Sequence, residues 1–218
     1  MAKEFYFDKL YPFQDEVLRV INGVKTDFYL TGGTTLSRAY LHHRFSEDLD
    51  LFVNDDDRFS TWAARVVDSL EQRAGWKVTV LHTDDRFVRC TVAATDAPLR
   101  VEMVNDVPAH VGDIVEHPVL GRIDTAENIL ANKITALIDR DEAKDLADVW
   151  GLCTKMGLSL TSAIEDAGCK AACVFPADLA RVLCTATEKD WEVILWIQAP
   201  PVEQFLSDLR RLGEDLIL

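Results

Sequence analysis

The chain has 218 residues and a mass of 24.5 kDa, and its 48% apolar and 28% charged residues are typical of a globular chain with one large or two small domains. No apolar run approaches the ~20 residues that a membrane-spanning helix needs, and the five cysteines form no Cys-x-x-Cys pair, so a membrane protein, a zinc domain and a disulfide scaffold are excluded. The net charge is −14, and residues 1–120 and 121–218 each carry −7, so any contact with nucleic acid must be local, metal-assisted or helped by a partner.

Hydrophobic periodicity predicts a mixture of helices and strands before residue 115 and helices almost throughout from residue 126. Three helices are expected in the first part, over residues 10–21, 35–43 and 58–74. Five strands are expected there, over residues 27–30, 48–53, 76–81, 87–94 and 99–104. The predicted fold class is α+β, a mixed β-sheet flanked by helices and followed by a C-terminal helical module. Domains are expected over residues 1–115 and 116–218.

A glycine pair follows the first predicted strand, in the segment Leu30-Thr31-Gly32-Gly33-Thr34. Glycines let backbone N–H groups approach a phosphate closely, and the N-terminus of a following helix adds a favourable dipole. Thr34 or Thr35 is expected to cap that helix and to offer a hydroxyl to an anion. A plain tight connection is an equally good interpretation of the glycine pair alone.

Two acids lie one residue apart on the second predicted strand. Asp48 and Asp50 share one face of the strand, whereas Leu49 and Leu51 point to the other face. Carboxylates about 7 Å apart repel one another unless a cation lies between them, and Mg²⁺ (or Mn²⁺) suits such a pair. The alternative is a solvated edge strand whose acids point outward. The acids and the glycine turn together favour a site for a nucleoside triphosphate.

The same segments resemble a known family. Leu-Thr-Gly-Gly-Thr-Thr-Leu at 30–36 and His-Arg-Phe-Ser-Glu-Asp-Leu-Asp-Leu-Phe at 43–52 resemble the AbiEii/AbiGii (MenT-like) nucleotidyltransferase toxins, within the DNA-polymerase-β-like nucleotidyltransferase superfamily. The segment 127–140 is similar to the lysine-bearing helix of that family. Residues 144–148, Lys-Asp-Leu-Ala-Asp, resemble its Arg-Asp-Leu-x-Asp element, with lysine in place of arginine. The resemblance covers residues 27–53 and 126–150, and it implies a nucleotidyltransferase fold.

The motifs and the resemblance together supply candidate site residues. The expected catalytic residues are Asp48, Asp50, Glu102, Lys133 and Asp148. The expected metal ligands are Asp48, Asp50 and Glu102. The expected nucleotide-binding residues are Gly32, Gly33, Thr34, Arg44, Ser46, Lys133 and Asp145. The resemblance implies that Lys133 reaches the triphosphate, and that Asp145 and Asp148 pair with Lys133 or orient the acceptor hydroxyl.

Four of these residues have alternative roles. Lys133 borders an apolar stripe, so its ammonium group either extends to solvent or points into a cleft. Glu102 shares a strand face with Arg100, so it is a third metal ligand, a general base or the partner of Arg100 in an ion pair. Asp145 and Asp148 share a helix face. The alternative for them is an acid near the helix N-terminus, where it interacts favourably with the helix dipole, and a surface charge.

The function expected from these observations is Mg²⁺-dependent nucleotidyl transfer. The protein is predicted to move an NMP from an NTP to an RNA (tRNA) or protein acceptor, as a toxin with a cognate antitoxin. A non-catalytic protein of the same fold, which binds a nucleotide or a partner without turnover, is the alternative. We expect a cytoplasmic protein with reduced thiols and no membrane partner.

Overall fold

The computed structural model describes residues 2–94, 98–140, 142–170 and 174–217. The chain forms two compact units, of which unit 1 comprises Met1–Thr35 and Ser46–Asp124 and unit 2 comprises Leu36–Phe45 and Thr125–Leu218. These bounds differ from the expected domains, since residues 36–45 belong to unit 2 and residues 116–124 belong to unit 1. The division near residue 115 stays a prediction.

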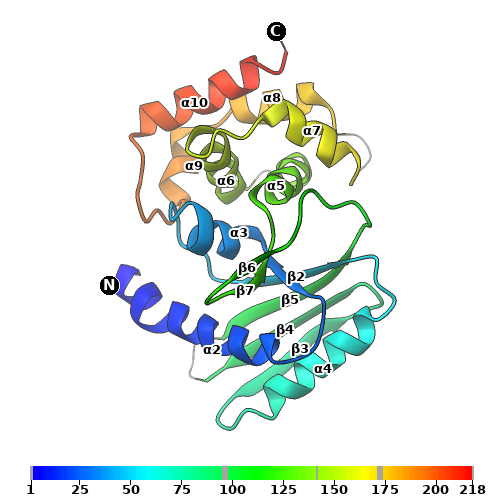
Figure 1. Cartoon of the computed structure of the whole chain (residues 1–218). Coiled ribbons are helices and arrows are strands. Elements are labelled where there is room, and N and C mark those ends of the chain that lie inside the picture. Colours follow the sequence, from blue (N-terminus) through cyan, green and yellow to red (C-terminus); the bar gives the residue numbers. More distant parts are fainter. Residues whose placement is uncertain (1, 95–97, 141, 171–173, 218) are drawn as a thin grey trace. The chain divides into compact units, whose positions relative to one another are not determined.

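Unit 1 is built on a seven-stranded mixed sheet with the order β3-β4-β5-β2-β1-β7-β6 (Figure 1). Its strands are β1 (Tyr29–Thr31), β2 (Leu49–Asn54), β3 (Lys77–Thr83), β4 (Phe87–Ala93), β5 (Leu99–Asp106), β6 (Val115–His117) and β7 (Gly121–Ile123). The β2–β5 and β1–β7 pairs are parallel, and the other neighbours are antiparallel. All five predicted strands are present. β6 and β7 were missed because three residues are too few for a periodic pattern.

One face of this sheet is covered by two helices, α2 and α4, which lie side by side (Figure 1). The helices of unit 1 are α1 (Ala2–Phe5), the π-helix η1 (Tyr6–Leu10), α2 (Tyr11–Asn22), α3 (Gly32–Thr35) and α4 (Phe59–Glu71). Phe28, next to β1, packs edge-on against Phe59 and Trp62 of α4. In β2, Leu49 and Leu51 are buried and alternate with partly exposed residues. The apolar face of the sheet therefore meets the helices, and the opposite face carries Asp50.

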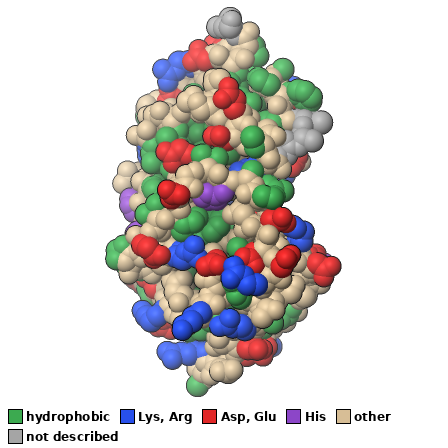
Figure 2. All heavy atoms as spheres, turned by 45° about the vertical axis from the view of Figure 1, so that its right-hand side comes forward, with side chains coloured by type: hydrophobic (Ala, Val, Ile, Leu, Met, Phe, Trp, Pro, Cys, Tyr) green, Lys and Arg blue, Asp and Glu red, His purple; other side chains and the backbone are tan. Residues whose placement is uncertain are grey.

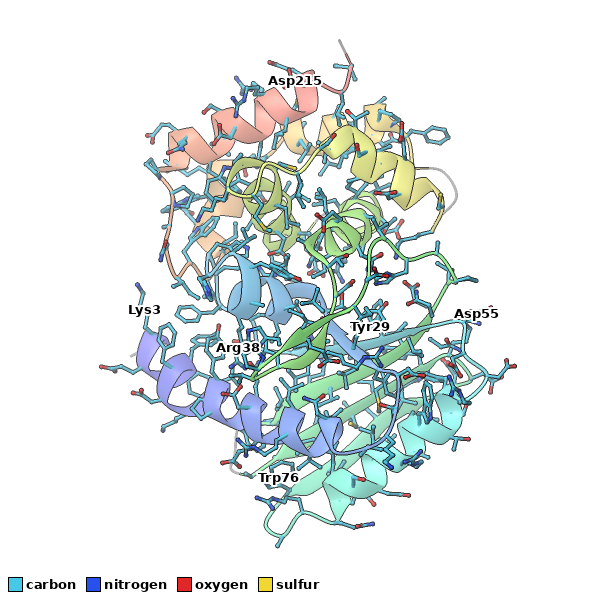
Figure 3. All side chains as sticks on the ribbon, in the orientation of Figure 1. Lys3, Tyr29, Arg38, Asp55, Trp76 and Asp215 are labelled. Atoms are coloured by element: carbon cyan, nitrogen blue, oxygen red, sulfur yellow. The ribbon has the colours of Figure 1, made fainter. Side chains whose placement is uncertain are left out.

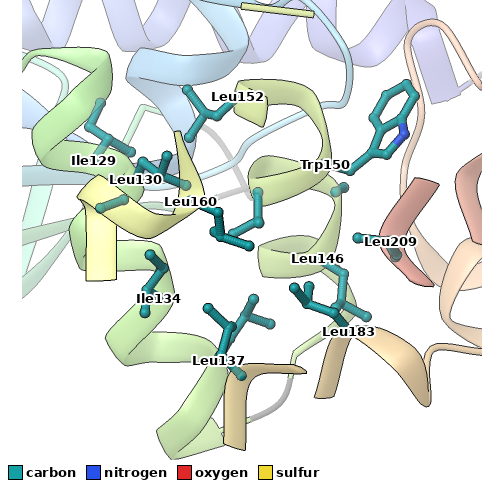
Figure 4. Packing of buried hydrophobic residues seen from close by; sticks show 14 of the residues in the cluster. Ile129, Leu130, Ile134, Leu137, Leu146, Trp150, Leu152, Leu160, Leu183 and Leu209 are labelled. Atoms are coloured by element: carbon teal, nitrogen blue, oxygen red, sulfur yellow. The ribbon is translucent and has the colours of Figure 1, made fainter. Parts of the chain in front are cut away.

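Unit 2 is helical, and a single apolar cluster occupies its interior (Figure 4). Its helices are the π-helix η2 (Leu36–Tyr40), α5 (Ala126–Arg140), α6 (Ala143–Thr154), α7 (Leu160–Gly168), α8 (Pro176–Cys184), α9 (Glu188–Val193) and α10 (Val202–Glu214). Leu137 of α5, Leu146 of α6 and Leu183 of α8 contribute fully buried side chains to this cluster. No helix in the described part of the chain is both long and apolar enough to cross a membrane.

The helix after β1 begins earlier than the sequence predicts. It starts at Gly32 as α3, instead of at residue 35, and continues as η2 to Tyr40. Gly32 has a φ of +68°, a conformation that glycine adopts without strain. Thr34 and Thr35 therefore lie within the first turn, and the predicted cap at these residues is wrong. The hydroxyl of Thr35 instead donates to the carbonyl oxygen of Thr31, over 3.1 Å.

Candidate active site

A row of polar side chains crosses four neighbouring strands of unit 1. In the register of the sheet, Asp50 of β2 lies between Thr31 of β1 and Glu102 of β5. Arg89 of β4 lies opposite Glu102 on its other side. Directly paired residues point to the same face of a sheet, so these four side chains share the face that α2 and α4 leave open. Tyr29, labelled in Figure 3, lies two residues before Thr31 on the same face of β1.

The glycine turn lies directly against one of the predicted metal ligands. A Cβ atom added to Gly32 would be 2.5 Å from Oδ2 of Asp50, a distance that real Cβ atoms do not reach. The backbone of Gly32 therefore approaches the Asp50 carboxylate as closely as only glycine permits. Asp48 and Asp50 are partly exposed, and Gly33 is buried in the first turn of α3.

Thr34 anchors the loop that leads into β2. Its Oγ1 lies 3.0 Å from Oγ of Ser46, and it donates a hydrogen bond to the carbonyl oxygen of Asp48. Gln14 of α2 donates from Nε2 to the carbonyl oxygen of Ser46, over 3.3 Å. Thr34 and Gln14 are fully buried, so these bonds fix the backbone that carries Asp48. The nucleotide-binding roles of Thr34 and Ser46 stay predictions.

Two arginines pair with acids on this face. Arg100 contacts Asp48 through Nη2, and its Nε lies 3.4 Å from Oε1 of Glu102. Arg89 donates from Nε to the same Glu102 oxygen, over 2.8 Å. The ion pair between Arg100 and Glu102, one of the roles that the sequence left open, is present. The shorter bond to Arg89 was not foreseen, because it depends on the sheet register.

The carboxylates of unit 1 suit a hard divalent cation. Mg²⁺ binds one or two protein carboxylates and completes its shell with water and substrate phosphates. Asp50 provides such a carboxylate beside Gly32. Asp48 provides a second carboxylate and is paired with Arg100, whereas Glu102 is engaged by two guanidinium groups. Among the residues that the structure describes, no group of three or more His, Cys, Asp or Glu side chains is placed to hold a metal ion. The donors therefore fit a cation held by Asp48 and Asp50, and Glu102 as a third ligand stays a prediction.

In unit 2, Lys133 of α5 and two aspartates of α6 form a buried ionic cluster. Nζ of Lys133 lies 2.6 Å from Oδ1 of Asp145 and 2.7 Å from Oδ2 of Asp148. Both aspartates are fully buried, and Lys133 is 7% exposed. The interpretation that Lys133 extends to solvent is therefore wrong, and so is the interpretation that the two aspartates are surface charges. The pairing of Lys133 with both aspartates, which the resemblance implied, is present.

Three more side chains complete this cluster. Arg44 donates two hydrogen bonds to Asp148, from Nε to Oδ1 over 2.7 Å and from Nη2 to Oδ2 over 2.6 Å. Nε2 of His43 lies 2.9 Å from Oδ1 of Asp148. Nε and Nη2 of Arg140 lie 2.9 and 2.8 Å from Oδ2 of Asp145. Such a fork of parallel N–H bonds to a carboxylate is strong and sets its geometry. The nucleotide-binding roles of Arg44 and Asp145 stay predictions.

The charges of this cluster are stable near neutral pH. Burial by itself raises the pKa of Asp148, but the positive charges of Arg44 and Lys133 outweigh burial and hold that pKa well below its usual range. Burial acts to lower the pKa of Lys133, but Asp148 and Asp145 more than compensate and raise it. Burial lowers the pKa of His43 despite its bond to Asp148, which favours the neutral form of this imidazole. Asp148 is thus an anion held by two cations and a neutral histidine.

The predicted site residues therefore fall into two groups. Unit 1 brings together Gly32, Gly33, Thr34, Ser46, Asp48, Asp50 and Glu102. Unit 2 brings together Arg44, Lys133, Asp145 and Asp148. His43 was not predicted as a partner of Asp148, although it directly precedes Arg44 in the motif that matched the family. Arg140 ends the segment 127–140 that is similar to the lysine-bearing helix of the family, but it was not predicted as a partner of Asp145. Arg89 had no comparable signal.

The mixed sheet, with a glycine turn against an Asp-x-Asp strand, has the fold of a nucleotidyltransferase. The structure is similar to that of JHP933 from Helicobacter pylori, with a TM-score of 0.63 and 22% sequence identity over 95% of this chain and 92% of that chain. It is also similar to MenT4, a nucleotidyltransferase toxin from Mycobacterium tuberculosis H37Rv, with a TM-score of 0.63 and 18% identity over 95% of this chain and 82% of that chain. At these identities the likeness shows the shared fold, and the predicted fold class is confirmed.

The sequence itself assigns the family. The model of the family described as "Nucleotidyl transferase AbiEii toxin, Type IV TA system" matches residues 17–211, so the chain belongs to this family of nucleotidyltransferase toxins. The match confirms the predicted family and, with it, the predicted enzyme class of the family, nucleotidyltransferase. "Uncharacterized protein aq_aa25" from Aquifex aeolicus (strain VF5) is 32% identical over 148 residues. That match covers 63% of each protein, so this chain spans less than two thirds of the length of that curated relative.

Proposed function

We propose that this protein transfers a nucleoside monophosphate from an NTP to a hydroxyl group of an RNA, in particular a tRNA, or of a protein. The observation that carries the proposal is the contact between Gly32 and Asp50, which puts a backbone turn suited to phosphate beside a carboxylate suited to a cation. Membership of a nucleotidyltransferase toxin family supports the same activity.

The residues of unit 1 have distinct roles in this proposal. The backbone N–H groups of Gly32 and Gly33 bind oxygens of the triphosphate, and Asp48 and Asp50 hold Mg²⁺ or Mn²⁺. The cation, when bound, neutralises charge on the phosphates and lowers the pKa of the acceptor hydroxyl. The acceptor oxygen forms a bond to the α-phosphorus, the bond from that phosphorus to the bridging oxygen breaks, and pyrophosphate leaves. Glu102 is the candidate base for the hydroxyl proton.

The proposal also assigns roles to unit 2. Lys133 is a candidate phosphate-binding cation, because its described contacts to Asp145 and Asp148 use two of the three donors of an ammonium group. Asp148, predicted as catalytic, is in this proposal a positioning residue, because it holds Lys133 in place. Arg44 and Asp145 are also candidate nucleotide-binding residues. The pairing of Arg44 with Asp148, and of Asp145 with Lys133, supports a role in positioning.

The surface charge bears on how an RNA acceptor would bind. On the face drawn in Figure 2, acidic side chains are spread over the whole face, whereas most of the Lys and Arg side chains lie in its lower half. Because the whole chain carries a net charge of −14, long-range attraction to RNA is absent, and binding depends on local contacts, the cation or a partner. A cytoplasmic location and a cognate antitoxin belong to the same proposal, and the family's description as a toxin–antitoxin system supports the antitoxin.

The test is a transfer assay with labelled nucleotides. The protein is incubated with each of the four NTPs, labelled at the α-phosphate, together with total RNA and a protein extract, with and without Mg²⁺. We expect one NTP to label RNA or protein only when Mg²⁺ is present. The same NTP labelled at the γ-phosphate is the control, and it should label neither. Label transferred from the γ-phosphate would contradict nucleotidyl transfer, because it indicates phosphoryl transfer.

The ion pairs of Asp48 and Glu102 with arginines favour a second candidate, a protein of this fold that binds a nucleotide or partner without turnover. Melting temperatures measured with each NTP, with and without Mg²⁺, separate the two. Stabilisation that requires Mg²⁺ supports the enzyme, because the cation and the triphosphate then share a site. A response without any dependence on Mg²⁺, combined with no transfer of label, supports the binding protein.

A further inference from the structure

A buried carboxylate holds the end of β1, immediately before the glycine turn. Asp124 follows β7 and is fully buried. Its backbone N–H donates to the carbonyl oxygen of Leu30, over 2.9 Å. The hydroxyl of Thr31 donates to its Oδ2, over 2.5 Å. Asp124 therefore forms hydrogen bonds with both residues that directly precede Gly32, Leu30 and Thr31.

The same carboxylate faces a histidine. Nε2 of His110 lies 3.0 Å from Oδ1 of Asp124, and Nδ1 of His110 lies 2.9 Å from the carbonyl oxygen of Gly112. A carbonyl oxygen and an ionised carboxylate are both acceptors, whereas a neutral imidazole has a single N–H donor. With Nδ1–H donated to Gly112, one further proton must lie between Nε2 and Asp124. Two acceptors therefore face one imidazole, and both contacts are hydrogen bonds only when both ring nitrogens carry a proton, as in an imidazolium that faces an ionised carboxylate.

We propose that His110 and Asp124 form an ion pair that positions the glycine turn through Thr31. Thr31 lies opposite Asp50 in the sheet register and directly precedes Gly32 in the chain. A shift of Thr31 therefore moves the turn and alters its fit to Asp50. His110 and Asp124 act as positioning residues, and their effect on transfer rests on the proposed function.

Other ionisable groups surround this pair. The ring of Tyr29 packs edge-on against His110, with 5.4 Å between the ring centroids, and its hydroxyl donates to Oδ1 of Asn54 over 2.8 Å. Burial and then the charges of Asp124 and Asp106 raise the pKa of Tyr29 well above its usual range, against smaller opposing effects of the hydrogen bond to Asn54 and the charge of Arg122. Tyr29 therefore stays neutral over the pH range of an assay and adds no negative charge beside Asp124.

The first test reads the protons of His110 by NMR and does not require transfer activity. Histidine is labelled with ¹⁵N in the full chain, and His110→Gln assigns the ring signals. We expect both ring nitrogens of His110 to carry protons at pH 7.5 in the wild type, and only one in Asp124→Asn. A neutral His110 in the wild type, or an unchanged signal in Asp124→Asn, would overturn the ion pair. Because the readout is independent of transfer, a failure of the proposed function is distinguishable from a failure of this inference.

The second test measures how the pair affects the use of NTP. His110→Gln and Thr31→Val should each raise the KM for the NTP about tenfold, with a smaller change in kcat, because they displace the turn and spare the acids. Thr31→Ser keeps the hydroxyl and should restore the wild-type KM. Melting temperatures identify a variant that fails to fold, and Thr31→Val then replaces His110→Gln as the decisive variant.

The matched control is His82→Gln on β3. His82 also pairs with an aspartate, since its Nε2 lies 3.0 Å from Oδ2 of Asp84, but both side chains are more than half exposed, at the end of β3 and just after it. This variant should keep the wild-type KM and kcat. A wild-type KM in Thr31→Val, or an equal change in His82→Gln, would overturn the positioning role of His110 and Asp124.

Discussion

The two units use the same residue type in opposite environments. In unit 1, Asp48 and Asp50 are partly exposed on an open sheet face, and the Asp48 side chain is 29% exposed. In unit 2, Asp145 and Asp148 are fully buried, and protein cations bind their carboxylates at 2.6–2.9 Å. An Asp-x-Asp pair on a strand and an Asp-x-x-Asp pair on a helix thus differ in burial and in their partners within one chain.

The physical difference is the cost of removing a carboxylate from water. A buried carboxylate must have charged or hydrogen-bonding partners, because it loses its hydration. Asp148 obtains these partners from Arg44, Lys133 and His43, and the cluster is therefore part of the folded core of unit 2. Asp48 and Asp50 keep contact with solvent and can exchange water for a ligand. Substitutions in unit 1 should therefore reduce activity first, and substitutions in unit 2 should reduce stability first.

Removal of one charge at Asp48 should have the largest effect. Asp48→Asn is expected to lower the rate of nucleotidyl transfer on the order of 10²–10³-fold, because electrostatic stabilisation at the reacting phosphate is lost. The melting temperature should stay near that of the wild type, because the side chain is partly exposed. Labelled transfer and thermal unfolding measure the two quantities. Asp57→Asn, at an exposed residue shortly after β2, is the control and should change neither.

Removal of one charge at Asp148 should chiefly affect folding. Asp148→Asn leaves the buried cations Lys133 and Arg44 without full compensation, and loss of one partner of a buried pair costs about 3–5 kcal/mol of the free energy of unfolding. Urea unfolding measures this loss. Asp139→Asn, at an exposed residue of α5, is the matched control, with an expected change below about 0.5 kcal/mol. A wild-type stability of Asp148→Asn would contradict the structural role of the cluster.

Two glycine substitutions separate backbone strain from the contact with Asp50. Gly32 and Gly75 both have a positive φ, of +68° and +84°, so alanine at either residue should cost about 1–2 kcal/mol of stability. A Cβ at Gly75 would meet nothing within 4 Å, whereas a Cβ at Gly32 would meet the Asp50 carboxylate at 2.5 Å. Gly32→Ala should therefore also lower transfer, by about tenfold or more, which corresponds to about 1.4 kcal/mol of activation free energy. Equal activities of the two folded variants would contradict the importance of the contact.

The smallest expected effect is a difference in pH dependence. Because Arg44 and Lys133 hold the pKa of Asp148 below its unfolded value against the effect of burial, this carboxyl contributes stability that is fully present above about pH 4. That contribution is lost as the pH falls through the lower pKa of the folded state. The free energy of unfolding, measured from pH 7 down to pH 3, should fall less steeply in Asp148→Asn than in the wild type. Asp48→Asn should keep the wild-type slope, and a shared slope of the wild type and Asp148→Asn would contradict this assignment.

Local patterns predicted much of the fold. The alternation along residues 48–53 is a property of neighbouring residues, and β2 indeed buries Leu49 and Leu51 while Asp50 stays on the other face. The same reasoning placed the helix start at residue 35 instead of Gly32, because the favourable positive φ of Gly32 is not visible in a hydrophobic pattern. The short strands β6 and β7 were missed for a related reason, since their three residues depend on pairing with other strands.

Partners of charged residues were harder to predict. The resemblance indicated that Lys133, Asp145 and Asp148 belong together, and the structure pairs them. It did not indicate that His43 contacts Asp148 across 105 residues of sequence, or that Arg89 reaches Glu102 from β4. Spacing within a helix or strand carries information over a few residues only, whereas these bonds arise when distant elements pack.

Residue order alone was sufficient to indicate the nucleotidyltransferase family, the strand that carries Asp48 and Asp50, and the glycine pair before a helix. Packing determined which charges are buried. In the folded chain, the carboxylate of Asp148 is enclosed by cations. The carboxylate of Asp124 lies between Thr31 and His110, and Asp50 lies beside Gly32. The reason is that the free energy of a charge depends on everything within several ångströms of it, and those neighbours come from parts of the chain that only the folded structure brings together.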